Sequence, residues 1–266
     1  MNTVSPENFK IAIIGAGNVA TRLGLAAKDK GFAIAGVTAR TRGSAARLAQ
    51  TLGCPALDSA ADIPADCDLV LIATNDRSVA DVAQILPQIK GVVAHTSGSV
   101  PLSVLAALHP RAAVIYPLQT FSRDVDVDVS VVPLFTEATD SASLAVADAF
   151  AGALSKSCYH ADSSRRAYLH VAGVLSSNFP IYLLELTRRV LDEAGLPLST
   201  VEPLVKASVA KAFQIGPHDA LTGPARRGDV GVLHKQLDLL SSPSARAIYE
   251  AISDAILNEY HKDIFP

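Results

Sequence analysis

Short apolar runs alternate with segments of helical character over the first 160 residues of the chain. Apolar runs of strand length occupy residues 10–14, 32–37, 54–57, 68–73, 91–95 and 112–116, and helical segments occupy residues 19–30, 44–52, 79–86 and 141–154. Residues 68–73 (DLVLIA) are apolar at nearly every position, which is typical of a central parallel strand that is buried on both faces. Strands that alternate with helices at this spacing predict an α/β fold with a doubly wound parallel sheet.

The pattern changes after residue 160, where no further strand-like run occurs. Helical periodicity continues through residues 163–193, 199–214, 229–240 and 244–260, with Gly and Pro at the breaks. We therefore expect two domains, a Rossmann-like domain over residues 1–160 and an all-α domain over residues 161–266. Pro180 lies inside the longest helical segment and should kink it, because proline has no N–H group to donate.

The turn after the first apolar run carries the pattern G-x-G-x-x-A, which is the dinucleotide fingerprint with alanine in its third place. Gly15 permits a sharp turn, Gly17 permits a pyrophosphate to approach the backbone, and Ala20 permits close packing of helix on strand. The free N–H groups at the start of the helix would bind the phosphates. The expected cofactor-binding residues here are Gly15, Gly17, Asn18, Val19 and Ala20. A merely structural turn is the alternative.

The loop after the second strand indicates which dinucleotide is bound. NAD sites usually place an acidic residue there, about 20 residues after the glycines, to bind the ribose 2′-hydroxyl. This chain has Thr38-Ala39-Arg40-Thr41-Arg42 instead, with no carboxylate. Arg40 and Arg42 can bind a 2′-phosphate, and Thr41 or Ser44 can add a hydroxyl donor. The loop favours NADP, with solvated surface arginines as the alternative. Ser44 is also expected to cap the following helix.

Polar residues follow two of the predicted strands at their carboxyl ends, where ligands bind in wound sheets. Ala73-Thr74-Asn75 follows one strand and His95-Thr96-Ser97-Gly98 ends the other. We expect Ala73, Thr74, Asn75, Ser97 and Gly98 to lie against the nicotinamide. His95 is a candidate proton donor, and a structural hydrogen bond at the strand end is an equally common role.

Three further candidates lie in the predicted helical domain. His170 and Asn178 are eight residues apart, which places them on one helix face about 12 Å apart along the axis. They can serve a substrate or the nicotinamide carboxamide, or they can fix helix register as buried polar residues. Arg227 lies in a glycine-rich loop and is a candidate anchor for a substrate anion, although a plain turn with Asp229 as helix cap is an equal alternative.

Composition narrows the possible partners and location. The net charge is −3 over 266 residues, so nothing favours nucleic acid or an anionic membrane as a partner. Three scattered cysteines, a polar start without signal-peptide character and the lack of an apolar run of about 18 residues indicate the cytoplasm. No metal site is expected, because neither Cys-x-x-Cys nor His-Glu-x-x-His occurs.

The whole chain resembles a bacterial family that pairs a Rossmann-like domain with a helical domain of unknown function. Its members are often described as NADP-dependent or coenzyme-F420-dependent oxidoreductase-like. The family looks like a branch of the 6-phosphogluconate dehydrogenase superfamily near pyrroline-5-carboxylate reductase. The matching segments are the glycine turn at 15–20, His95-Thr96-Ser97-Gly98, Pro117-Leu118-Gln119-Thr120-Phe121, Ser177-Asn178-Phe179 and, as the most specific, Leu221-Thr222-Gly223-Pro224-Ala225-Arg226-Arg227-Gly228-Asp229.

The resemblance implies a homodimer joined through the helical domains, with the active cleft between the two domains of each chain. Tyr116 stands before Pro117 where relatives often carry histidine. This departure weakens the case for a proton donor at that position.

The sequence therefore predicts an NADP-dependent reductase or dehydrogenase that acts on a small, anionic imine, carbonyl or hydroxy substrate. His95, His170 and Asn178 are the candidates for the polar group that serves the developing charge. Two alternatives stay open: a non-catalytic NADP-binding sensor or scaffold dimer, and an enzyme that uses F420 or NAD.

Overall fold

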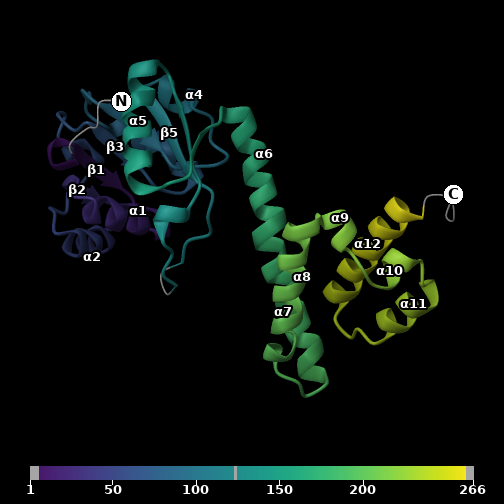
Figure 1. Ribbon diagram of the computed structural model, residues 1–266. Helices are drawn as coiled ribbons and strands as arrows, with labels where there is room; N and C mark the ends of the chain where they lie inside the picture. Colours follow the sequence, from purple (N-terminus) through teal and green to yellow (C-terminus); the bar gives the residue numbers. More distant parts are fainter. Residues whose placement is uncertain (1–5, 123–124, 262–266) are drawn as a thin grey trace. The chain divides into compact units, whose positions relative to one another are not determined.

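The computed structural model describes residues 6–122 and 125–261. The described strands form one seven-stranded sheet in the order β2-β1-β3-β4-β5-β6-β7. The strands labelled in Figure 1 belong to this sheet. β1 to β5 are parallel, β6 runs antiparallel to β5, and β7 is parallel to β6. The strands are β1 (Lys10–Ile14), β2 (Ala33–Thr38), β3 (Leu69–Ile72), β4 (Val92–His95), β5 (Ala112–Pro117), β6 (Leu134–Ala138) and β7 (Cys158–His160).

Alternating residues of the central strands supply two separate cores, one on each face of the sheet. In β3, Leu69 and Leu71 join a cluster with α1 (Asn18–Asp29) and α5 (Ser141–Leu154), whereas Val70 and Ile72 join a cluster with α3 (Val79–Ile85) and α4 (Ser103–Ala106). This period of two explains why the strand is apolar throughout. The predicted α/β class with a doubly wound sheet is confirmed.

Two local predictions in this part of the chain are wrong. The helix α2 (Arg42–Leu52) is capped by Thr41, whose side chain accepts a hydrogen bond from the N–H of Ser44, so Ser44 is not the cap. Residues 54–57 form no strand, because only an isolated bridge joins Ala56 to Val37.

The chain divides into two compact units, Met1–Ser177 and Asn178–Pro266. This division lies later than the predicted boundary at residue 160, because α6 (Ser163–Gly173) is tied to the first unit through the buried side chain of Arg166. A π-helical turn, Val174–Asn178, joins α6 to α7 (Phe179–Glu193). The wide turn ends two residues before Pro180, in the region where the sequence predicts a kink.

Over its described part, the second unit contains helices as its regular elements (green to yellow in Figure 1). Its one buried apolar cluster is small and consists of Ala225, Leu233 and Leu257, with Tyr249 and Ile256 packed against them. The helices that follow α7 are α8 (Glu202–Ile215), α9 (Pro217–Ala220), α10 (Pro224–Arg227), α11 (Val230–Asp238) and α12 (Pro243–Tyr260).

The helical run Ser163–Glu193 is 31 residues long and passes the length and composition test for a membrane span. The prediction that no apolar run reaches about 18 residues is therefore wrong, because an 18-residue stretch of this helix is apolar enough to cross a membrane. The most apolar part of the run is exposed in the chain rather than buried. It includes His170 and Asn178, which are costly to place in lipid.

Candidate functional site

The turn from β1 into α1 requires glycine at its first position. Gly15 has φ +118°, a conformation that side chains rarely adopt, and a Cβ there would lie 2.3 Å from the carbonyl oxygen of Ala73. The backbone of the turn therefore rests directly on the end of β3.

Gly17 has a different role, because a Cβ there would meet nothing within 4 Å. It is the N-cap residue of α1 and has no side chain to bind the N–H groups of the first helical turn. Those groups and the positive end of the helix dipole face open space. This arrangement fits the oxygens of a diphosphate. Asn18 adds its main-chain N–H, since its side-chain amide donates to the carbonyl of Phe121 at 2.7 Å.

A cleft of about 980 Å³ opens at the carboxyl ends of β1, β2 and β3. It is a suitable size for a cofactor. The predicted residues that line it are Gly15, Gly17, Asn18, Val19, Arg40, Thr41, Ser44, Ala73, Thr74 and Asn75. Ala20, Arg42, Ser97 and Gly98 are not part of its lining; Ala20 is fully buried against the sheet, as the packing role requires.

The two arginines of the ribose loop have different surroundings. Arg40 lines the cleft, whereas the Nε of Arg42 lies 3.3 Å from Oδ1 of Asp58, which itself lines the cleft. The side chains of Arg42 and Asp58 are 85% and 71% exposed. An exposed pair of this kind contributes little to stability, so Arg42 is available to exchange its partner for a phosphate.

His95 is fully buried at the end of β4. Burial, aided by the Arg166 guanidinium, lowers its pKa to about 4. Its Nδ1 accepts a hydrogen bond from the N–H of Ser97 at 3.2 Å, which fixes a neutral tautomer. The neutral, buried imidazole therefore orders the loop that follows β4.

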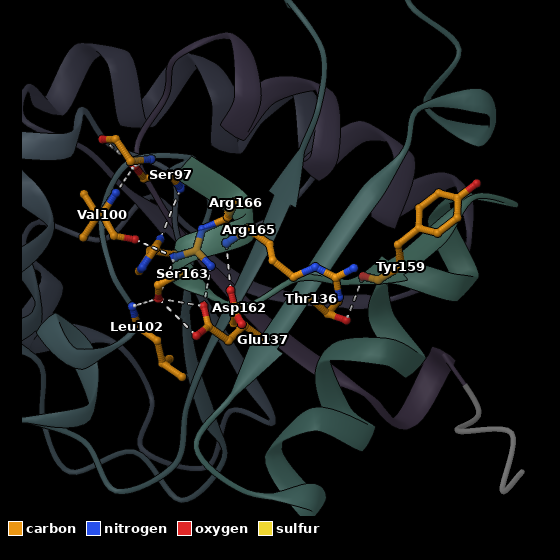
Figure 2. Close-up of polar contacts among 12 residues, drawn as sticks. Ser97, Val100, Leu102, Thr136, Glu137, Tyr159, Asp162, Ser163, Arg165 and Arg166 are labelled. Carbon is orange, nitrogen blue, oxygen red and sulfur yellow. Dashed lines mark hydrogen bonds and ion pairs between the residues drawn. The ribbon is translucent and has the colours of Figure 1, made fainter. Parts of the chain in front are cut away.

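Arg166 and Glu137, which the sequence did not single out, hold the loop that follows β4 (Figure 2). Arg166 is 1% exposed and forms an ion pair with Glu137, and its Nη2 donates to the carbonyl of Val100 at 2.7 Å. Ser163 Oγ donates to Glu137 at 2.9 Å and accepts the N–H of Leu102 at 3.1 Å. No sequence signal separates Arg166 from its exposed neighbour Arg165.

The same loop is joined to the cleft by serine side chains. Ser97 Oγ accepts the N–H groups of Ser99 and Val100 at 3.1 and 3.0 Å. Ser99 Oγ donates to the carboxylate of Asp76, which follows the cleft residue Asn75. Ser97 and Gly98 thus belong to a rigid loop beside the cleft.

His170 belongs to the first unit, where its Nδ1 lies 3.2 Å from the hydroxyl of Tyr116. Asn178 and Arg227 belong to the second unit. Asp229 occupies the predicted N-cap position of α11, but its side chain makes no cap hydrogen bond and instead accepts from Arg227 Nε at 2.9 Å. Among residues 6–122 and 125–261, no group of three His, Cys, Asp or Glu side chains is placed to hold a metal ion.

Residues 1–120 match the family model described as a Rossmann-like domain, and residues 132–256 match the domain of unknown function DUF2520. A solved structure from Bacteroides fragilis, described as a "putative NADP oxidoreductase", is 34% identical with a TM-score of 0.89; the match covers 96% of this chain and 100% of that one. The chain belongs to the family that joins these two domains. The expected resemblance is confirmed.

Two more distant structures share the fold. An imine reductase from Myxococcus stipitatus in complex with NADP+ is 17% identical, with a TM-score of 0.65 and coverage of 96% of this chain and 94% of that one. A 1-pyrroline-5-carboxylate reductase from Streptococcus pyogenes is 19% identical, with a TM-score of 0.63 and coverage of 95% and 98%. No curated protein sequence matches the chain.

Proposed function

We propose that the chain is an NADP-dependent oxidoreductase that acts on a small imine, carbonyl or hydroxy compound. The observation that carries the proposal is the uncapped start of α1 at Gly17, which opens into a cleft that Arg40 also lines. The 34% identity to a protein described as an NADP oxidoreductase supports it. So does the NADP+ held by the imine reductase of the same fold.

Different residues of the chain bind different parts of the cofactor. The first-turn N–H groups of α1 bind the diphosphate, and Arg40, with Arg42 beside it, binds the 2′-phosphate. Thr74, Asn75 and the rigid loop after β4 face the nicotinamide end. When bound, the nicotinamide supplies or accepts the hydride. The protein then contributes orientation of the two reactants and a polar group for the charge that develops on the substrate.

The substrate side of the proposal rests on the second unit. Arg227 anchors an anionic group on the substrate, exchanging its exposed partner Asp229 for that group, and Asn178 orients the reacting end. An Arg227→Ala variant is then expected to raise KM much more than the dissociation constant of NADPH. Unchanged kinetics in that variant would remove Arg227 from the site.

We further propose a homodimer formed through the helical unit and a location in the cytoplasm. The large exposed apolar side chains of the second unit support the dimer. The three free cysteines suit a reducing compartment.

A fluorescence titration with NADPH, NADH and F420 tests the cofactor, and NADPH is expected to bind most tightly. Absorbance at the nicotinamide band then follows turnover with 1-pyrroline-2-carboxylate, 2-oxobutanoate and lactate as an imine, a ketone and a 2-hydroxy acid. Tight NADPH binding without turnover of any compound would favour the sensor alternative, and tighter binding of NADH or F420 would contradict the cofactor assignment.

A further inference from the structure

Tyr116 and His170 form a polar pair beside the loop that follows β4. Tyr116 comes from β5 and is 8% exposed, whereas His170 comes from α6 and is exposed to solvent. The phenolic oxygen and the imidazole Nδ1 are 3.2 Å apart, and the ring planes meet edge to face at 64°. A nearly buried hydroxyl is thereby linked to a titratable group that reaches water.

Gly98 places this pair against the loop that follows β4. A Cβ at Gly98 would lie 2.7 Å from His170 Nδ1 and 2.8 Å from Tyr116 Cζ. The pair therefore packs directly on the backbone of the loop that adjoins the cleft. Arg166 and Ser97 fix that loop through Val100, so the pair and the loop form one rigid arrangement.

The other imidazole near this loop is unsuited to donate a proton. His95 is fully buried with its pKa lowered to about 4, its Nδ1 is occupied as an acceptor for Ser97, and its Nε2 has no hydrogen-bond partner among the described residues. Burial raises the pKa of Tyr116, with the Arg166 guanidinium acting in the opposite direction and Asp76 in the same one. The phenol therefore holds its proton at neutral pH, as a general acid must.

We propose that Tyr116 is the proton donor of the reduction and that His170 restores its proton, a role that rests on the proposed function. Reduction of a C=N or C=O bond adds a hydride to the carbon, with oxidation of NADPH to NADP+. The π electrons move to the nitrogen or oxygen, which forms a new bond to the proton of Tyr116 Oη. The tyrosinate takes a proton from His170 Nδ1, and His170 takes one from solvent.

A Tyr116→Phe variant removes the hydroxyl while keeping the ring that packs against Gly98. We expect kcat to fall by about 100-fold, the contribution of a positioned general acid. The dissociation constant of NADPH and the Tm should stay close to those of the wild type. Tyr159→Phe on β7 is the matched control, because it makes the same change away from the loop, and its kcat should be unchanged.

A His170→Ala variant tests the relay separately. We expect a loss of about tenfold or more in kcat, with recovery when imidazole is added, because the vacated position is open to solvent. A merely structural role would not give this rescue. In the apoprotein, the ¹⁵N resonance of His170 Nδ1 should move in Tyr116→Phe and stay in place in Tyr159→Phe.

The outcomes separate this proposal from the function on which it rests. A wild type that binds no NADPH, or reduces no compound of the panel, would overturn the function and the donor role together. Normal NADPH binding with full turnover in Tyr116→Phe would overturn the donor role alone. A His170→Ala loss without imidazole rescue, or an Nδ1 resonance that ignores Tyr116→Phe, would overturn the relay.

Discussion

The two units of the chain differ in how they bury apolar surface. The first has three buried clusters built around the sheet, which include Ile11, Phe150 and Val70. In its described part, the second has one cluster of three buried residues. It also leaves large apolar side chains exposed, with Phe213 at 91% and Leu239 at 77%.

This difference shows where each unit obtains its stability. Burial of apolar surface contributes about 25 cal/mol per Å², so the first unit has the core that a self-sufficient domain needs. The second unit lacks it, and exposed patches of this kind mark association surfaces. In the proposed homodimer, a second copy of the chain covers this surface. Substitutions in the first unit should therefore lower the free energy of unfolding, whereas substitutions on the exposed apolar surface of the second unit should weaken association.

The largest effect is expected from Arg166→Met in the first unit. Removing one partner of a buried ion pair costs about 3–5 kcal/mol, because Glu137 is left without its counter-charge. Urea unfolding measures the loss. Arg165→Met is the control, since its exposed side chain should change stability by less than about 0.5 kcal/mol. Equal stability of the two variants would show that the Arg166 network does not hold the first unit together.

His95 gives the first unit a specific dependence on pH. Its pKa is about 4 in the folded chain and 6.5 for an exposed histidine, so the unfolded chain binds the proton more tightly. The contribution of His95 to the free energy of unfolding is therefore highest above pH 6.5, and it falls by about 3 kcal/mol in total as pH falls toward 4. Urea unfolding at several pH values should show this extra slope in the wild type and not in His95→Asn. Parallel pH curves for the two proteins would contradict the burial of a neutral His95.

Phe213→Asp tests the association of the second unit. If Phe213 lies in the dimer interface, the dimer of this variant should dissociate, which analytical ultracentrifugation detects. The free energy of association should weaken by about 2 kcal/mol per chain, because the apolar ring is no longer buried. Val131→Asp, an equally simple change at an exposed position of the first unit, should leave the oligomeric state unchanged. A monomeric wild type, or a Phe213→Asp variant that stays dimeric, would remove this surface from the interface.

A smaller effect is expected in the ribose loop. Arg40→Ala should weaken NADPH binding about tenfold, or about 1.4 kcal/mol, and leave NADH binding unchanged. Arg42→Ala should reduce the preference for NADPH as well, because it releases Asp58 to bind a ribose hydroxyl. Titrations of both cofactors with Arg77→Ala as control give the comparison. An equal loss of affinity for NADPH and NADH would show that the arginines attract the cofactor through their overall charge and do not bind the 2′-phosphate.

Much of the fold of the first unit can be predicted from local sequence patterns. The period of two in β3 and the glycine turn at Gly15 depend on neighbours in sequence, so both could be predicted. The cap of α2 could not, because Thr41 and Ser44 both carry hydroxyls and only the backbone geometry selects between them.

The contacts around the candidate site that the sequence does not predict join residues far apart in the chain. Arg166 and Glu137 are 29 residues apart, and Tyr116 and His170 are 54 apart. No spacing rule links such positions, because the sheet and α6 bring them together only after folding. Its helix face predicts a role for His170, whereas the departure of Tyr116 from the family pattern weakens the case for a proton donor there. The candidate site is therefore harder to predict from the sequence than the fold, because its contacts form only when distant segments pack together.

Calorimetry of NADPH binding to the wild type and to Gly17→Ala tests the central claim most directly. Gly17 has φ −82° and open space at its Cβ position, so alanine there should leave the Tm unchanged. The added methyl group should weaken NADPH binding about tenfold or more, because it occupies the approach of the diphosphate to α1. A wild type that releases no heat with NADPH, or a Gly17→Ala variant that binds it equally well, would contradict the account.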